Sequence, residues 1–343
     1  MSTRRLDLRA IGSQDKRSNR EENLGPIGVC KVANLSDIAF TYDDLDEIWP
    51  LILGDYPDAT AAYYNGDYSK SLQAAQMDKH KWVLEGIGFE PKFKVIDIGC
   101  GWGPMLKAIK DRGGEAIGLT LSPRQAETCK RYGLTVYLLD WKALEPGRFG
   151  RFDAVVSIGA FEHFCSIEEF VRGEQERIYD SFFKLCSDLL PSGGMFYLQT
   201  MTWGTCVPWR DRKRLTAGEI ERYSSLSAPK KSDERILAYV RAFFPGSWLP
   251  ANKEQIVDVA APYFDLRKSS DGRLDYIQTL TEWEKAWYAP KPGKILAMLK
   301  LWPNYILGGK PYRVKMRCVK ENALREVFVR NLFGHQRLFF KKR

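Results

Sequence analysis

The sequence of 343 residues predicts an α/β fold, with a mostly parallel sheet of seven strands and helices on both of its faces. Between residues 93 and 201, short apolar segments alternate with segments of helical periodicity, which is typical of parallel strands joined by crossover helices. A glycine-rich run also follows the first apolar segment, at the point where a helix is expected to begin. Together these two observations favour an open, layered sheet over a helical bundle or an all-β fold.

The individual elements follow from apolar spacing and from helix-breaking residues. Helices are expected over residues 59–86, 104–111, 123–131, 167–190, 277–289 and 312–332. Strands are expected over residues 93–98, 116–120, 134–138, 152–157, 195–201, 263–268 and 337–340. Pro104 and Pro123 suit the first turn of their helices, where the missing N–H has no intrahelical partner.

The chain divides into an extension and one domain. Residues 1–58 are predicted to be an N-terminal extension that is partly disordered, because polar residues dominate its first part. Residues 59–343 form the expected domain. Residues 203–255 interrupt the alternation of strands and helices and are rich in Trp, Pro and Arg, so they are predicted to be a helical lid insertion.

The net charge of +9 is concentrated near the C-terminus, where 15 Lys and Arg oppose 3 Asp and Glu from Glu284 onward. This suits an anionic partner such as a lipid head group or an acidic carrier protein, with a solvated basic helix as the simpler alternative. Nucleic acid is not expected, because no nucleic-acid-binding module is recognisable.

The seven cysteines are widely spaced and include no CxxC pair. This pattern predicts free thiols in a reducing compartment and no metal site. The N-terminus does not resemble a signal peptide, and no apolar run approaches the roughly 18 residues of a membrane span. We therefore expect a cytoplasmic protein, with the inner membrane face as a place of peripheral attachment.

The glycine-rich run begins with an acidic residue at the end of the first strand. Asp97 is followed by Gly99, Gly101 and Gly103, which allow a tight turn and a close approach of the backbone to a ligand. The spacing is GxGxG rather than the GxGxxG of dinucleotide-binding enzymes. It favours S-adenosylmethionine, with the methionine carboxylate near the helix N-terminus and Asp97 near the amine.

Five segments then resemble, in order, the cyclopropane fatty acid synthase family, which includes the mycolic acid cyclopropane synthases. They are Val95–Gly103, Gly118–Gln125, Ser157–Phe164, Phe244–Pro250 and Asp275–Trp283. The resemblance runs from about Ala59 to the C-terminus. It implies the class I methyltransferase Rossmann-like fold and S-adenosylmethionine as cofactor.

The resemblance implies a set of cofactor-binding residues. They are Thr60, Asp97, Gly99, Cys100, Gly101, Trp102, Gly103, Thr120, Leu121, Gln125, Asp140 and Trp141. Thr120 and Gln125 stand where many methyltransferases use an acidic residue for the ribose. Asp140 and Trp141 are expected near the adenine, although a core position explains Trp141 equally well.

In this family the nucleophile is an alkene of a lipid chain, and methyl transfer leaves a carbocation that must lose a proton. Aromatic faces stabilise a cation, so Phe161, Tyr63, Tyr64 and Tyr276 are candidates, with core packing as the alternative for each. The family holds a bicarbonate ion as the base, gripped by a Glu, a His, a Tyr and a Cys.

Two of these four ligands are matched here, by Glu162 and Tyr276. The His position is Gln199 and the Cys position is Ala61, while a further cysteine of the family aligns with Leu324. Gln199 can donate a hydrogen bond but cannot titrate near neutrality. Three possibilities stay open: an altered bicarbonate site, proton removal by Glu162 or Tyr276, or a different base.

His163 is expected either to orient Glu162 or to be a buried structural histidine. The functional prediction is an S-adenosylmethionine-dependent C-methyltransferase or cyclopropane synthase that acts on an alkene of a lipid or another hydrophobic acceptor. One alternative is an N- or O-methyltransferase of a small metabolite, because N-methylation requires only a lone pair. Another is a cofactor-binding partner protein without activity.

Overall fold

The computed structural model describes residues 57–209, 215–290 and 309–343, together with a few isolated positions outside these ranges. Most of the expected N-terminal extension, including its predicted disorder, lies outside the described residues. None of the helices that the structure describes combines the length and the apolar character that a membrane crossing requires. The six cysteines within the described residues are unpaired, as predicted.

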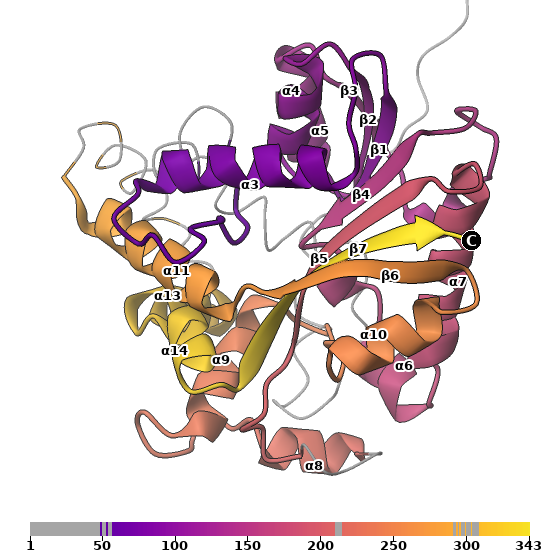
Figure 1. Ribbon diagram of the computed structural model, residues 1–343. Helices are drawn as coiled ribbons and strands as arrows, with labels where there is room; N and C mark the ends of the chain where they lie inside the picture. The colour runs from indigo at the N-terminus through magenta and orange to yellow at the C-terminus, as the bar shows by residue number, and fades with distance from the viewer. Residues whose placement is uncertain are drawn as a thin grey trace, which may run out of the picture. The chain divides into compact units, whose positions relative to one another are not determined.

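The centre of the fold is one seven-stranded sheet with the order β3-β2-β1-β4-β5-β7-β6 (Figure 1). Its strands are β1 (Lys94–Ile98), β2 (Glu115–Thr120), β3 (Thr135–Leu138), β4 (Ala154–Ile158), β5 (Met195–Trp203), β6 (Phe264–Asp271) and β7 (Phe333–Lys342). β7 runs antiparallel to both of its neighbours, and the other pairs are parallel. The predicted sheet is confirmed, and β7 extends furthest beyond its predicted range.

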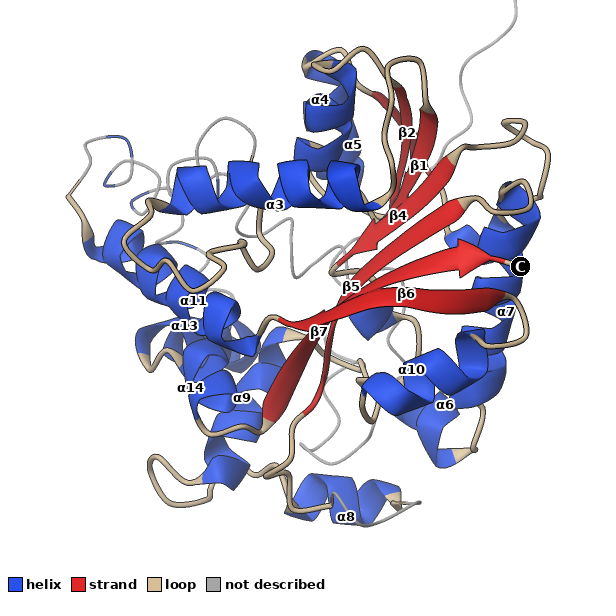
Figure 2. Cartoon of the chain, in the orientation of Figure 1, coloured by secondary structure: helices blue, strands red, loops and turns tan. Residues whose placement is uncertain are grey.

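Helices cover both faces of the sheet (Figure 2). They are α3 (Leu72–Gly86), α4 (Pro104–Lys110), α5 (Pro123–Arg131), α6 (Ile167–Val171), α7 (Gln175–Leu189), α8 (Ala217–Arg222), α9 (Asp233–Phe243), α10 (Lys253–Ala260), α11 (Arg273–Tyr288), α13 (Gly309–Lys320) and α14 (Ala323–Val329), with the 3-10 turns η2 (Trp141–Ala143) and η3 (Phe161–His163). Apolar residues of α3 and α4 pack on one face, and those of α7 and α10 pack on the other. Helices α8 and α9 lie within the predicted insertion, whose role as a lid stays a prediction.

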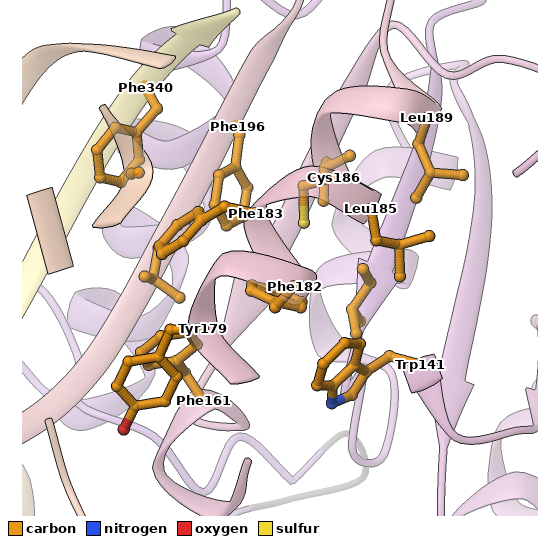
Figure 3. Packing of buried hydrophobic residues seen from close by; sticks show 14 of the residues in the cluster. Trp141, Phe161, Tyr179, Phe182, Phe183, Leu185, Cys186, Leu189, Phe196 and Phe340 are labelled. Atoms are coloured by element: carbon orange, nitrogen blue, oxygen red, sulfur yellow. The ribbon is translucent and has the colours of Figure 1, made fainter. Parts of the chain in front are cut away.

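An aromatic core joins α7 to the sheet and fixes the turn η3 (Figure 3). Phe161 of η3 is fully buried, and its ring centroid lies 4.3 Å from that of Tyr179 and 5.6 Å from that of Phe182. Aromatic pairs at these separations contribute about 0.5–1.5 kcal/mol each beyond their buried area. This packing holds in place the next residue of the turn, Glu162.

The helix predicted over residues 59–86 is wrong in its first part, because α3 begins only at Leu72. Asn65 and Gly66 adopt left-handed backbone angles, with φ of 53° and 80°, which a right-handed helix cannot contain. Ser71 caps the helix, and its side chain accepts a hydrogen bond from the backbone N–H of Ala74. The preceding residues 57–70 form the loop that enters the site described below.

Two other helices were predicted too long. The expected helix over 167–190 is divided into α6 and α7 by Gly173, which has a φ of 76°. The expected helix over 312–332 is divided into α13 and α14 by Asn322, which has a φ of 49°. Glycine and asparagine are the residues that adopt this conformation at least cost, so each ends one helix and redirects the chain into the next.

Candidate active site

A cavity of about 410 Å³ lies where the parallel strands end at their carboxyl edge. Asp97 of β1, Thr120 of β2 and Ile158 of β4 border it, each at or next to the last residue of its strand. The helices α11 and α14 and the strand β7 close its other side. This is the place where open α/β sheets bind their ligands.

The glycine loop forms one wall of the cavity. Gly99, Gly101 and Gly103 all have positive φ angles, of 88°, 55° and 79°. A Cβ atom at Gly99 would lie 2.3 Å from the Cβ of Ala160, whereas one at Gly101 would meet nothing within 4 Å. Glycine is therefore required at position 99 by packing as well as by backbone angle, while the surroundings of Gly101 leave room for a ligand.

The backbone N–H groups of the loop are not all free for a ligand. Those of Gly99 and Cys100 both donate to the carbonyl oxygen of Leu119, at 2.9 Å, and that of Gly103 donates to Cys100. The loop is thus tied to the end of β2 before any ligand binds. Cys100, Trp102 and Leu121 border the cavity beside it, and their contact with a cofactor stays a prediction.

Asp97 is buried at the end of β1, with 2% of its surface exposed. Its Oδ1 has no hydrogen-bond partner among the described residues. Burial, with the charge of Asp58, raises the pKa of Asp97 to about 7, although Lys79 opposes the shift. An unpaired carboxylate in this position fits a cationic ligand group, such as the amine expected from the sequence.

The predicted ribose and adenine contacts also reach the cavity. Thr120 donates a hydrogen bond of 2.7 Å to the side-chain oxygen of Gln125, and both residues border the cavity. Asp140 accepts from the backbone N–H of Lys142. Trp141 borders the cavity and also packs on the aromatic core, with its ring centroid 5.2 Å from that of Phe182, and its contact with adenine stays a prediction.

A buried ionic network that sequence analysis missed lies beside Asp97. Lys79 Nζ is 2.6 Å from Asp58 Oδ2 and donates to Thr60 Oγ1 at 2.7 Å. His80 Nε2 also lies 2.8 Å from Asp58 Oδ2. All four residues border the cavity, so the predicted contact Thr60 is held in place by charged neighbours. The sequence indication of this network was Lys79, a charged residue on the buried face of α3.

Glu162 borders the cavity from η3. Its Oε1 accepts a hydrogen bond of 2.8 Å from the backbone N–H of Met201, and its buried Oε2 has no partner among the described residues. Burial raises the pKa of Glu162 to about 7, although hydrogen bonds from the backbone of Met201 and Glu162 and from the side chain of Thr200 act to lower it. His163, also at the cavity, lies with its Nδ1 2.8 Å from Ser247 Oγ. Burial lowers the pKa of His163 to about 4.

Gln199, the residue at the expected histidine position, is almost fully buried. Its side-chain oxygen accepts from the hydroxyl of Tyr197 at 2.9 Å, and its amide nitrogen donates to the carbonyl oxygen of Ala61 at 3.2 Å. Ala61 and Leu324 border the cavity as well. All three departures from the family pattern therefore lie in the site.

Four aromatic residues, here called the aromatic wall, also line the cavity. They are Trp49, Tyr276, Trp283 and Phe328. The ring centroids of Tyr276 and Phe328 are 4.6 Å apart, and those of Trp49 and Trp283 are 5.4 Å apart. Only Tyr276 of this set was a sequence candidate, although Trp283 lies on the same helix, α11; Trp49 and Phe328 come from other segments.

Two of the remaining aromatic candidates for this wall are core residues, and the third, Tyr63, is half-buried. Phe161 and Tyr64 are fully buried, and the ring of Tyr63 stacks on that of Trp82 at 4.8 Å. Within the described part of the chain, none of these three borders the cavity. Their positions follow from the aromatic core and from the packing of α3, neither of which is visible in local sequence patterns.

Comparison with known proteins gives three findings. Residues 30–310 match the family model described as mycolic acid cyclopropane synthetase. The chain is 30% identical over 276 residues to cyclopropane mycolic acid synthase 1 of Mycobacterium tuberculosis, which covers 77% of this chain and 86% of that protein. The crystal structure of mycolic acid cyclopropane synthase CmaA1 complexed with SAH and CTAB has a TM-score of 0.68 at 24% identity and covers 91% of this chain and 99% of that one.

A solved structure of an N-methyltransferase has a related fold. Coclaurine N-methyltransferase bound to N-methylheliamine and SAH has a TM-score of 0.63 at 17% identity, and the match covers 88% of this chain and 82% of that one. At this identity the likeness extends to the fold alone.

Proposed function

The chain belongs to the mycolic acid cyclopropane synthetase family and is an S-adenosylmethionine-dependent methyltransferase, and from this premise we propose that it methylates an alkene carbon of a lipid or another hydrophobic acceptor. The observation that carries the proposal is the placement of Glu162 and Tyr276 in one cavity with the glycine loop. The product is a cyclopropane or a methyl branch, depending on which proton leaves.

The residues at the end of the sheet suit the cofactor. When bound, S-adenosylmethionine supplies a methyl group on a positively charged sulfur. Asp97 would hold the amine, Thr120 and Gln125 the ribose, and Trp141 the adenine. Burial of these groups excludes water, which strengthens each electrostatic interaction in the site.

The aromatic wall suits a hydrophobic acceptor. A cation against the face of an aromatic ring is stabilised by about 2 kcal/mol or more when water is excluded. A smaller cavity of about 70 Å³ continues past Trp283 and Leu324 toward Cys318, and it has an apolar lining. We propose that the hydrocarbon part of the acceptor extends into this smaller cavity.

Glu162 has the role of stabilising positive charge on the acceptor. Its Oε2 has no protein partner among the described residues, so it is the oxygen that a cation or a proton would meet. A bicarbonate ion, which the family resemblance implied, loses support here. Two ligand positions are altered, and the amide of Gln199 is engaged by Tyr197 and Ala61.

A second candidate function is N-methylation of a small metabolite. It is favoured by the absence of a titratable group at Gln199, because attack by a nitrogen lone pair leaves no carbocation. The likeness of fold to an N-methyltransferase is compatible with it. The acceptor assay described next separates the two candidates.

The test uses purified protein, methyl-labelled cofactor and two classes of acceptor. Vesicles of an unsaturated phospholipid represent the alkene, and a set of small amines and phenols represents the alternative. We expect label in the acyl chain, identified by mass spectrometry. The variant Glu162→Gln should lose turnover while retaining cofactor affinity, with Glu176→Gln, an exposed residue of α7, as the control. Full activity in Glu162→Gln would contradict the proposal.

A further inference from the structure

His335 is a buried histidine of the cavity to which the mechanism above gives no role. It lies on β7 opposite Met201 of β5, and its side chain borders the cavity. Only 2% of its surface is exposed, and its Nδ1 is fully buried without a hydrogen-bond partner among the described residues. An unpaired buried polar group costs about 1–3 kcal/mol, so packing alone does not account for a histidine here.

The neighbours of His335 are the groups assigned to the reaction. Its ring lies edge-on to that of Tyr276, with centroids 5.1 Å apart and an angle of 69° between the planes. Its ladder partner Met201 provides the backbone N–H that binds Glu162. The imidazole therefore belongs to the same wall of the cavity as the two matched residues of the family pattern.

The packing of His335 orients its ring. A Cβ atom at Gly272 would lie 2.3 Å from the Nδ1 of His335, so this nitrogen faces the backbone at the start of α11. With Nδ1 buried against this backbone, Nε2, the second nitrogen bonded to Cε1, is the remaining ring nitrogen that can accept a proton. The ring position is fixed by the ladder and by the missing side chain at position 272.

The electrostatic surroundings keep the imidazole neutral. Burial, with the positive charges of Arg337 and Lys79, holds the pKa of His335 well below its usual value. The ring of Tyr276 contacts the imidazole, and the carboxylate of Asp275 is engaged by Arg337 at 2.9 Å. A neutral imidazole is ready to accept a proton over the whole physiological pH range.

We infer that His335 is a catalytic residue that accepts the proton lost from the acceptor after methyl transfer. This inference rests on the proposed alkene methylation. A C–H bond of the new methyl group, or of a carbon next to the cationic one, breaks. Its electron pair closes the ring or forms a double bond, and the proton passes to Nε2. The proton then leaves to solvent, which restores the neutral imidazole. A carbocation is so strong an acid that a weak base suffices.

The test compares the wild type with His335→Gln and His335→Asn, using the full chain and vesicles of an unsaturated phosphatidylglycerol. We expect kcat to fall about 100-fold or more, the usual contribution of a positioned base. The affinity for S-adenosylhomocysteine should change by no more than about threefold, because the cofactor residues lie on other strands. The ratio of ring to branched product should also shift, which a purely structural role would not produce.

A rescue variant strengthens the test. Gln199 borders the same cavity from β5, so Gln199→His in the His335→Gln background restores an imidazole to it and should recover part of the rate. Unchanged rate and product ratio in both single variants would overturn the inference and leave the proposed function intact. Absence of carbon methylation by the wild type would overturn both.

Discussion

Lys79 and Asp58 form a buried ion pair, with 2.6 Å between Nζ and Oδ2 and side chains that are 1% and 8% exposed. The pair links α3 to the loop that carries Thr60. Burial tends to raise the pKa of Asp58, but Lys79 and His80 outweigh it and hold that pKa far below its usual value. The carboxylate of Asp58 is therefore charged at all physiological pH values, and its buried charge requires the counter-charge of Lys79.

We expect Lys79→Met to lower the free energy of unfolding by about 3–5 kcal/mol, because it leaves a buried carboxylate without its main counter-charge. Urea denaturation measures the change. Lys70→Met removes the half-exposed pair between Lys70 and Asp78, at 2.7 Å, and serves as the control. That control should cost only about 0–1 kcal/mol. Equal losses in both variants would show that Lys79 is not specially stabilising.

Gly272→Ala should destabilise the chain by about 1–3 kcal/mol, the usual cost of overpacking. The new Cβ would lie 2.3 Å from His335 Nδ1 and 2.8 Å from Arg337 Cζ. Gly218→Ala is the matched control. Gly218 lies in the helix α8, and a Cβ atom there would meet nothing within 4 Å. The control should be neutral or slightly stabilising in thermal unfolding, whereas a neutral Gly272→Ala would mean that the ring of His335 is not confined.

Binding of S-adenosylhomocysteine should release a proton near pH 6.5. With its pKa raised to about 7, Asp97 is largely protonated there, and a cationic amine beside it would favour the charged form. Calorimetry in buffers of different ionisation enthalpy measures the released proton. Asp97→Asn should abolish the buffer dependence. A wild-type binding enthalpy that is the same in every buffer would contradict this placement of the amine.

The contribution of Glu162 to the free energy of unfolding should fall as the pH rises from about 4.5 to 7. Its folded pKa is raised to about 7, so the folded state binds the proton more tightly than the unfolded state does. The stabilisation is complete below the unfolded pKa and is lost as pH rises through the folded one. About 1.4 kcal/mol per pKa unit gives a total of roughly 3 kcal/mol. The difference in unfolding free energy between the wild type and Glu162→Gln should follow this curve, and a flat difference would contradict it.

The sequence alone identifies some residues of the site and not others. The loop from Asp97 to Gly103 was predictable because strand, turn and helix are adjacent in the chain. The ion pair of Asp58 and Lys79 was missed because it joins residues of a loop and a helix that local periodicity treats separately. His335 was missed because its role depends on the pairing of β7 with β5.

The misplaced elements have a similar cause. A single glycine, Gly173, divides the predicted helix over 167–190, although an isolated glycine is often tolerated within a helix. Phe161 was a candidate for the cavity and is instead buried against α7. The local sequence does not show which way an aromatic residue next to a candidate site residue points. The tertiary packing of α7 decides it.

The basic C-terminal region leads to the last prediction, that the protein binds anionic membrane surfaces. Arg313 and Arg317 are exposed on α13. Each basic residue near an anionic surface contributes about 1 kcal/mol, so Arg313→Gln with Arg317→Gln should weaken vesicle binding by roughly 30-fold. Co-sedimentation with phosphatidylglycerol vesicles at low and high salt measures it.

The matched control for that experiment is Arg177→Gln with Lys184→Gln, which removes two exposed charges from α7, on another part of the surface. It should leave vesicle binding unchanged, because a charge acts on the membrane only within about 10 Å at 0.1 M salt. High salt should remove the difference between the two double variants, since both retain the same apolar surface. If they weaken binding equally, net charge alone is responsible and α13 is not the attachment site. If neither does, the acceptor reaches the cavity without electrostatic help from this helix.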